Sequence, residues 1–580
     1  MDEQGGYWER HRITRLPRRR FLSAAGAGIA GLTAASALAC GQRGATTQQA
    51  KTASGSSGSA GQPVAGGVYN YYQPTNPPTL DPQRTTSYFT MQPASAPYSR
   101  IFALQAGPDP QLSESAEIEP DLGLSAESPD GITWTIKLRT DAKFQNVAPV
   151  NGHALDTTDI KGSWVRTLDK ANPNLGELDM VDASQIQTPA PDTMVFKLNY
   201  PYAAFPKILA GPKYGWILPR EAILGAIDPA KVMIGSGPFI LDNYTPDVAL
   251  TFKRNPDWFQ KGRPYLDGVR YAIVPDTAAQ LAQFAGGNLD ELDSISGTNL
   301  DTAKKQNPKA TFFTADSNQQ NALVGQLGDP SSPWVDVRVR HAISMMIDRN
   351  AISSSVFSGH ASPTGLLPPK FGKWSLKAQD LDATAAQYYK FDPATAKKML
   401  SDAGVPASPF AKLIYTSNGY PQPYATLAET VNSMLNAQGV KTNLVNVDYN
   451  KDYVAGGKGI HYGAFDKDSL VFALAGDGYV DVDQILFAFY NSHSTRLNTP
   501  IKDSTFDAMQ TKARAILKDD ERLKAYLDLQ KYLVDKMYFI AGWPEEPRYR
   551  LVQPWVKSYL FWANYSFFTD SYTKLWLQKS

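Results

Sequence analysis

Short alternations of apolar and polar residues dominate the chain after a polar N-terminal segment. Residues 131–139 place every second side chain from Ile132 to Leu138 on one apolar side, which predicts a half-buried strand. Residues 193–199 and 248–255 repeat this pattern. Because Pro and Gly separate these segments from apolar stretches with helical spacing, we expect a mixed α/β protein.

Five longer segments carry apolar residues at helical spacing. They are residues 277–287, 336–357, 392–404, 426–439 and 521–536. Asp392 followed by Pro393 is typical of a helix start, and Gly404 is typical of a helix end. The segment after Asp336 is expected to form one helix through residue 357.

Length and charge limit the function. A chain of 580 residues exceeds the roughly 250–300 residues at which a single core stops growing, so two or three packed units are expected. The 57 Lys and Arg residues nearly balance the 56 Asp and Glu residues, which gives a net charge of +1. We therefore expect no nucleic-acid partner.

The N-terminal segment has the layout of an export signal. An uncharged Ala/Gly-rich stretch, residues 23–39, follows a cluster of arginines and is short for a membrane-spanning helix. Four residues before it resemble the twin-arginine signal, in which two arginines precede a variable residue, Phe and Leu. They are Arg18, Arg19, Phe21 and Leu22.

Cys40 is the only cysteine, which excludes an internal disulfide and any metal site built from several cysteines. Ala37 to Cys40 resemble a lipobox, whose cysteine becomes the lipidated first residue of the mature protein. A signal-peptidase site after Ala39 is the alternative. Residues 40–65 are rich in Gly, Ser, Thr, Gln and Ala, as in a flexible tether. We expect a lipid anchor that holds the protein outside the cytoplasm, at the outer face of the cytoplasmic membrane.

Six segments occur in the order and with the motifs of one protein family. The match includes a "TLDP" segment, an "SGPF" turn leading into a strand, and a "DVRVRHA" block. These segments resemble the family 5 extracellular solute-binding proteins, the dipeptide, oligopeptide and nickel receptors of bacterial ABC importers. They span residues 76–86, 119–146, 234–259, 274–293, 332–352 and 390–404.

The resemblance implies two α/β lobes that close like a clamp on a ligand, with an extra subdomain in the first lobe. It implies a monomer that needs no cofactor or metal and delivers a peptide-like solute to a permease and an ATPase in separate chains. The expected domains are a signal peptide at 1–39, a tether at 40–65, a first-lobe core, its extra subdomain at 106–225 and a second lobe at 316–539. The first-lobe core combines 66–105, 226–315 and 540–580.

Peptide binders of the family place an acidic residue against the ligand's α-amino group, in a loop after a strand. Asp477, preceded by Ala475 and Gly476, falls at this position. In the alternative interpretation Asp477 is a solvated turn residue, and Asp481 or Asp483 caps the next helix.

On the first lobe, the resemblance indicates a second group of ligand contacts. Tyr72, Gln73 and Thr75 follow a strand at the place where relatives offer main-chain contacts to an extended ligand.

Other functions have less support from the residues. An oligosaccharide or another small solute in the same clamp remains open, as does a sensing role without import. A secreted hydrolase lacks a GxSxG elbow, so we expect no enzyme. Nickel or haem binding would need histidines drawn from distant positions, because the six histidines form no HExxH motif.

Overall fold

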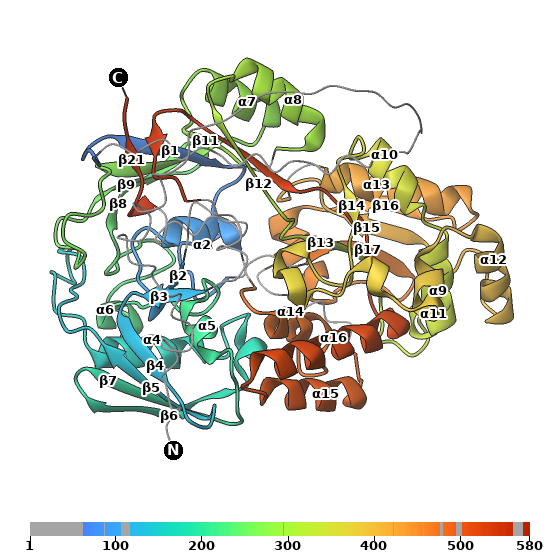
Figure 1. Ribbon diagram of the computed structural model, residues 1–580, viewed down its shortest axis with the longest axis horizontal. Coiled ribbons are helices and arrows are strands. Elements are labelled where there is room, and N and C mark those ends of the chain that lie inside the picture. Colours follow the sequence, from blue (N-terminus) through green and yellow to red (C-terminus); the bar gives the residue numbers. More distant parts are fainter. Residues whose placement is uncertain are drawn as a thin grey trace, which may run out of the picture. The chain divides into compact units, whose positions relative to one another are not determined.

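The computed structural model describes residues 62–85, 87–105, 117–293, 295–420, 423–455, 458–475, 479–494, 501–560 and 572–579. The chain divides into two compact units, Met1–Gln62 and Pro63–Ser580, and every described element lies in the second. Two lobes make up this unit (Figure 1). Lobe 1 holds β1 to β12 and β19 to β21, and lobe 2 holds β13 to β18 with their helices.

The main sheet of lobe 1 has the strand order β1-β10-β9-β8, with β1 parallel to β10 and the other pairs antiparallel. Its strands are β1 (Val68–Gln73), β10 (Gly268–Ile273), β9 (Ala249–Arg254) and β8 (Phe239–Thr245).

Gly235 and Gly237 precede β8, and a Cβ atom on either would lie 2.7 Å or less from a backbone atom of Ala96 or Pro97. The "SGPF" turn thus serves close chain packing, as the sequence predicts.

A smaller sheet of order β11-β19-β12 extends lobe 1 toward lobe 2. Apolar side chains of α7, α8 and β19 form one core beneath it, including Phe284, Leu300 and Leu551. The elements are β11 (Glu291–Leu292), β12 (Thr311–Ala315), β19 (Arg548–Val552), α7 (Thr277–Ala285), α8 (Gly297–Gln306) and the paired β20 (Val556–Lys557) and β21 (Trp576–Leu577).

The remaining part of lobe 1, here called the subdomain, is built on an antiparallel sheet of order β4-β5-β7-β6. On β5, Trp134, Ile136 and Leu138 are buried, which confirms the predicted alternation. The sheet strands are β4 (Gly123–Glu127), β5 (Thr133–Leu138), β6 (Val181–Ala190) and β7 (Thr193–Leu198). Around them lie β2 (Phe102–Leu104), β3 (Ile118–Pro120), α2 (Tyr88–Ala94), α4 (Thr157–Thr167), η2 (Leu175–Leu178), α5 (Phe205–Ala210) and α6 (Arg220–Ile223).

Lobe 2 is a sheet of order β13-β17-β15-β16 with an apolar core on each face. Side chains alternate along β13, so Leu323 enters one core while Ala322 and Val324 enter the other. The strands are β13 (Gln320–Gly325), β15 (Lys412–Tyr415), β16 (Asn443–Asn446) and β17 (Ser469–Ala475). Helices α9 (Val337–Met345), α10 (Arg349–Ser355), α12 (Pro393–Asp402) and α13 (Tyr424–Ala437) supply the first core.

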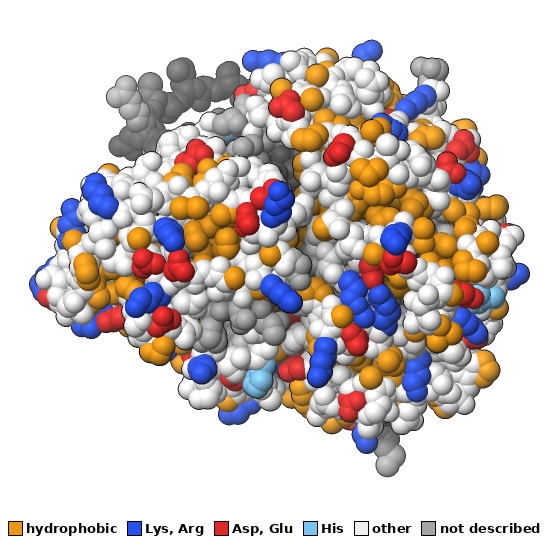
Figure 2. Space-filling view, turned by 180° about the vertical axis from the view of Figure 1, so that it is seen from behind, with side chains coloured by type: hydrophobic (Ala, Val, Ile, Leu, Met, Phe, Trp, Pro, Cys, Tyr) orange, Lys and Arg blue, Asp and Glu red, His pale blue; other side chains and the backbone are white. Residues whose placement is uncertain are grey.

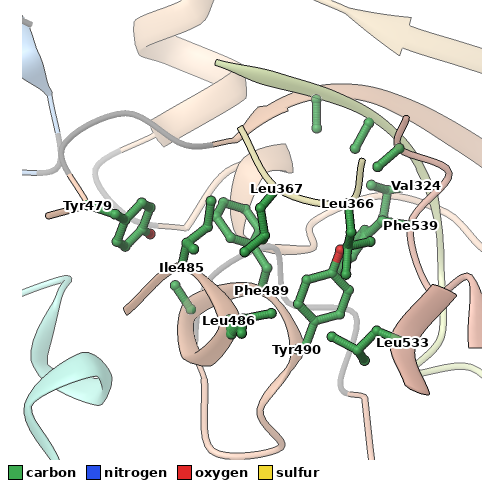
Figure 3. Packing of buried hydrophobic residues seen from close by; sticks show 14 of the residues in the cluster. Val324, Leu366, Leu367, Tyr479, Ile485, Leu486, Phe489, Tyr490, Leu533 and Phe539 are labelled. Atoms are coloured by element: carbon green, nitrogen blue, oxygen red, sulfur yellow. The ribbon is translucent and has the colours of Figure 1, made fainter. Parts of the chain in front are cut away.

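The second core of lobe 2 lies between the sheet and α14 (Val482–Tyr490), α15 (Ser504–Arg514) and α16 (Asp519–Lys536). Figure 3 shows Ile485, Leu486 and Phe489 of α14 packed with Leu367 and Phe539. Shorter elements complete the lobe: η3 (Pro333–Val335), β14 (Ser362–Pro363), η4 (Pro369–Trp374), η5 (Ala378–Asp380), α11 (Ala383–Ala386), η6 (Gln387–Tyr389), η7 (Tyr449–Val454), η9 (Ile460–Tyr462) and β18 (Pro544–Glu545).

The predicted helices form, with one correction. Asp336 and Asp392 cap α9 and α12 as expected, because their carboxylates accept backbone N–H bonds from Arg338 and Thr395. The single helix expected over 336–357 is wrong. Asp348 accepts bonds from the backbone N–H groups of Asn350 and Ala351, which ends α9 and starts α10.

Acidic and basic side chains are interspersed over the face shown in Figure 2. This mixture agrees with the net charge of +1 and gives this face no continuous basic surface for a polyanion.

Candidate functional site

Two chain segments cross between the lobes side by side. The first, residues 316–319, links β12 of lobe 1 to β13 of lobe 2, and the second, residues 546–547, links β18 to β19. We call them hinge segments A and B. An isolated bridge between Leu323 and Ile540 and the β14–β18 pair hold the lobe 2 ends of both segments together.

A cavity of about 50 Å³ lies against both hinge segments. Its polar wall is made by Ser317, Gln319, Asn321, Glu545, Glu546 and Arg548. Its apolar wall is made by Ile295, Phe357, Pro423, Tyr424, Leu427 and Pro547. Since lobe 1, lobe 2 and both hinge segments contribute to the lining, the cavity lies where hinge motion changes its shape.

Asn321 is held rigidly at this cavity. Its backbone N–H and its Nδ2 donate to the same oxygen of Glu545, Oε1, at 3.1 Å and 2.8 Å. Its other amide atom, Oδ1, is buried and has no hydrogen-bond partner among the described residues. A buried acceptor without a donor is unfavourable, so the cavity favours a guest that donates a hydrogen bond.

Glu546 joins hinge segment B to a helix of lobe 1. Its Oε2 accepts the backbone N–H of Gly297, the first residue of α8, at 2.8 Å. Burial raises the pKa of the Glu546 carboxyl to about 7, although the hydrogen bond from Gly297 works in the opposite direction. Glu546 therefore changes charge near neutral pH.

A buried ionic cluster forms the lobe 1 base of the cavity. The Asp293 carboxylate accepts Arg548 Nη2 at 3.1 Å and Arg550 Nε at 2.8 Å, while Arg548 Nη1 donates to Asn318 Oδ1 at 2.8 Å. Burial alone would raise the pKa of Asp293, but Arg550 and Arg548 hold it well below its usual range. The charge of Arg548 is thus engaged from below the cavity.

The first-lobe residues predicted at the ligand lie at the end of β1. The Tyr72 hydroxyl donates to the backbone oxygen of Asp293 at 2.7 Å, and its ring is buried in the lobe 1 core. Gln73 Nε2 donates to the backbone oxygen of Thr75 at 2.8 Å, while its buried Oε1 has no described partner. Tyr72 therefore supports the strand, whereas Gln73 and Thr75 form a local turn.

The strand that precedes the predicted amine loop ends next to hinge segment A. Ala475 ends β17 and pairs with Gln320 of β13. Gly476 and Asp477 lie outside the described residues, as do Arg18, Arg19, Phe21, Leu22 and Cys40 of the leader. The capping alternative is confirmed for Asp481, which is the N-cap of α14 and accepts the N–H of Asp483.

A second contact joins the lobes through the subdomain. Lys213 Nζ donates to Glu177 Oε2 at 2.6 Å and lies 3.9 Å from the ring centroid of Tyr479, two positions after Asp477. The Tyr479 hydroxyl lies 3.4 Å from Glu177 Oε1. We call these three residues the lysine contact.

Arg514 of α15 forms a parallel contact, the arginine contact. Its Nε donates to both carboxylate oxygens of Asp483 at 3.0 Å and 2.9 Å, and its Nη1 reaches Asp179 at 3.4 Å and the Tyr200 hydroxyl at 2.5 Å. Burial alone would lower the pKa of Arg514, but Asp483 raises it well above its usual range. In each contact the buried cation pairs with a buried anion of its own lobe, Lys213 with Glu177 and Arg514 with Asp483. The partners from the other lobe are Tyr479 in the lysine contact, and Asp179 and Tyr200 in the arginine contact.

Asn321, Glu545 and Glu546 were not predicted at the site. Two adjacent glutamates between Pro544 and Pro547, directly after the apolar run 539–543, are the local signal that marks hinge segment B. Asn321 gives no such signal, because its partner Glu545 is 224 positions away.

Metal and membrane features were also sought in the described ranges. No group of three or more His, Cys, Asp or Glu side chains is placed there to hold a metal ion. No helix in those ranges is long and apolar enough to span a bilayer.

Residues 117–496 match the model of the bacterial extracellular solute-binding proteins, family 5, middle region. This chain belongs to that family. Family membership makes it a solute-binding protein that works outside the cytoplasm.

Curated relatives extend the match. The chain is 25% identical over 384 residues to the glutathione-binding protein GsiB of Escherichia coli, covering 64% of this chain and 67% of that protein. It is 26% identical over 497 residues to di/tripeptide-binding protein 2 of Pseudomonas aeruginosa, covering 80% and 86%.

Solved structures share the fold. The oligopeptide-binding protein AppA of Bacillus subtilis, in complex with a nonapeptide, superimposes with a TM-score of 0.74 at 20% identity, covering 89% of this chain and 100% of AppA. The periplasmic binding protein DppA of Helicobacter pylori, in complex with the peptide STSA, gives 0.75 at 20% identity, covering 89% and 99%. The predicted two-lobed clamp is therefore confirmed.

Proposed function

We propose that this solute-binding protein captures a short peptide with a free α-amino group and delivers it to an ABC permease and ATPase in separate chains. The observation that carries the proposal is the family match over residues 117–496. Two of the similar proteins are named for di/tripeptides and glutathione, and two similar structures hold peptides. The solute binds, is enclosed by hinge closure and leaves chemically unchanged.

In this proposal Asp477 pairs with the α-amino group of the peptide. Asp477 follows β17 in the sequence, and β17 ends beside hinge segment A, so a ligand held near that end would meet both lobes. A carboxylate enclosed between lobes is stable only when it is paired, and an incoming ammonium provides that pair. Gly476 and Ala475 offer backbone groups next to it, and Gln73 and Thr75 are the proposed lobe 1 contacts.

The N-terminal export signal and Cys40 support a proposed location for the protein in the cell. Export through the twin-arginine-like signal followed by lipidation of Cys40 would keep the receptor at the outer face of the membrane, near its importer. Replacing Cys40 by Ser is expected to abolish palmitate incorporation and release the protein from membranes. Retention at the membrane without lipid would contradict the anchor and leave the binding function untouched.

The alternative is that the clamp binds a solute other than a peptide. A similar structure, AgaA with agropinic acid, has a TM-score of 0.75 at 22% identity, and NikZ of Campylobacter jejuni, with Ni(L-His), has 0.69 at 18%. The fold alone therefore does not fix the ligand.

The test starts with the full-length protein and mass spectrometry of the ligand that co-purifies with it. Calorimetric titration with di- and tripeptides, each with a free or an acetylated amino group, follows. We expect peptides to bind, acetylation to weaken binding more than tenfold, and Asp477→Ala to have the same effect.

Asp520→Ala, which removes an exposed aspartate in the first turn of α16, is the matched control. Binding of acetylated and free peptides with equal affinity would remove Asp477 from this role, and a co-purified non-peptide would overturn the peptide assignment.

A further inference from the structure

The hinge cavity presents oxygen acceptors without matching donors. Asn321 is 5% exposed, and its Oδ1 lacks a described partner. The orientation of this amide is fixed by chemistry, because the carboxylate of Glu545 accepts hydrogen bonds and therefore faces Nδ2. Oδ1 is left as the atom that a guest in the cavity meets.

The charges around the cavity favour a cation. Glu545 and Glu546 line it, and Glu546 Oε1 makes no hydrogen bond to described residues. Arg548, the cation of the lining, already pairs with Asp293 at 3.1 Å beneath the cavity. A positively charged guest would therefore face the Glu546 carboxylate and an amide oxygen, while Arg548 is held to Asp293, a carboxylate that it shares with Arg550.

The apolar part of the lining and the volume of the cavity limit which guest fits. Phe357, Tyr424 and Leu427 are buried and apolar on this side, and the Tyr424 hydroxyl is turned away to the backbone oxygen of Phe472 at 2.5 Å. A water-sized group needs roughly 10–15 Å³, so a cavity of about 50 Å³ accepts the end of one side chain and not a whole peptide. Methylene groups suit the apolar wall, and an ammonium suits the oxygen wall.

We infer that the hinge cavity is a subsite for an alkylammonium group of the solute, bound by Asn321 Oδ1 and Glu546 against the Phe357–Tyr424–Leu427 wall. The inference rests on the proposed function, because it assigns a specificity to the ligand captured between the lobes. A lysine-type side chain supplies this ammonium, because the proposed function assigns the α-amino group to Asp477. Because the lining comes from both lobes and both hinge segments, an ammonium held here would also favour the closed clamp.

The experiment compares tripeptides that carry lysine or norleucine at each position in turn. Norleucine keeps most of the chain length and lacks the charge. For the parent protein at pH 8, we expect the lysyl peptide to bind at least about tenfold more tightly than its norleucyl partner at one position. N-acetylated versions should keep the same preference even if they bind more weakly, because acetylation of the α-amino group leaves the side-chain ammonium unchanged. Equal affinity of all lysyl and norleucyl partners overturns the inference.

Two variants test whether the preference for lysine over norleucine arises in the hinge cavity. Glu546→Gln keeps an oxygen for the N–H of Gly297 and removes the charge, so the lysine preference should fall to about threefold or less. Asn321→Leu removes the free acceptor and should act in the same direction, with thermal melting to verify the fold. The matched control is Glu521→Gln on α16, an exposed glutamate paired with Lys518 at 3.2 Å, which should keep the full preference. A preference that neither cavity variant reduces overturns the inference.

A small probe separates this inference from the proposed function. If the parent protein binds no peptide, the proposed function fails, and n-butylammonium is then tested against 1-butanol by saturation-transfer NMR. Saturable binding of n-butylammonium that Glu546→Gln weakens severalfold supports the subsite. No binding, or binding equal in parent and variant, overturns it.

Discussion

The two places where the lobes meet are built in opposite ways. At the lysine and arginine contacts, each buried cation has a buried anion within 3.0 Å, so these contacts are complete without a ligand. At the hinge cavity, Asn321 keeps an acceptor without a partner, and Glu546 is held in surroundings that disfavour its charge. The first interface stabilises the arrangement of the lobes, while the second leaves an interaction for the solute to complete.

Polar residues at the two interfaces should therefore affect different properties of the protein. A charge that is already paired changes the free energy of folding when it is removed, whereas an unpaired acceptor chiefly changes affinity. Mutations at the subdomain contacts should therefore lower stability, and those at the hinge cavity should alter ligand choice and pH dependence.

The largest effect is expected at the arginine contact. Arg514→Met leaves Asp483 buried with only Gln510 and Tyr526 as hydrogen-bond donors from side chains, so the free energy of unfolding should fall by about 3–5 kcal/mol. Urea unfolding followed by tryptophan fluorescence measures this. Arg338→Met, which breaks the exposed pair with Asp336, should lose far less stability, because water screens this pair. Equal losses in both variants would contradict the comparison.

The lysine contact allows a sharper test, because both charges can be removed together. Lys213→Met alone removes the cation beside the buried Glu177, which keeps the Tyr214 hydroxyl as a hydrogen-bond donor, and should lower the free energy of unfolding by about 3 kcal/mol. The double variant Lys213→Met with Glu177→Gln removes the uncompensated charge, so most of that loss should be recovered. Chemical denaturation of the parent, the two single variants and the double variant gives the coupling energy. Additive losses would show that the pair is not coupled.

The elements that could be predicted are those with a local cause. Trp134 and Ile136 face the subdomain core because alternation along a strand is a local property, and Asp392 caps α12 through its own neighbours. The break at Asp348 was missed, since apolar spacing continues across it and only the cap decides where one helix stops.

The candidate site was harder to predict, because its partners are distant in the chain. Asn321 meets Glu545 across 224 positions, and Glu546 meets Gly297 across 249. Family resemblance predicted ligand contacts in the loop of Asp477 and at the end of β1. Neither prediction points to the residues of hinge segment B. Only the crossing of both segments between the lobes brings these residues together.

Glu546 predicts a pH dependence of stability. Its pKa of about 7 in the folded chain lies above its ordinary value of 4.5, so the folded state holds the proton more tightly. Stability should therefore fall as pH rises from about 4.5 to 7, by at most about 3 kcal/mol, and then level off. Glu546→Gln should remove this slope, as measured by melting temperature against pH.

Other charged or titratable groups near Glu546 could also affect how the melting temperature depends on pH, so a control variant is needed. Arg548, Tyr549 and Glu545 share the strand region of Glu546, and His360 lies against Gly297 from lobe 2. Because His360 lies beside the residue whose N–H Glu546 binds, the profile is repeated with His360→Asn. A slope that disappears with His360→Asn and persists with Glu546→Gln would assign the effect to the histidine.

The smallest effect should come from Tyr479, the residue that links the lysine contact to the ligand loop. Its hydroxyl lies 3.4 Å from Glu177, too long for a strong bond, so Tyr479→Phe should change the free energy of unfolding by less than about 0.5 kcal/mol. Tyr479→Leu also removes the ring 3.9 Å from the Lys213 ammonium, a loss of about 1–2 kcal/mol. If closure carries this contact, the leucine variant should release ligand severalfold faster in stopped-flow measurements, while the phenylalanine variant should match the parent. Equal release rates in all three proteins would mean that the lysine contact is present in the open clamp as well, and would leave the hinge cavity as the interface that responds to the solute.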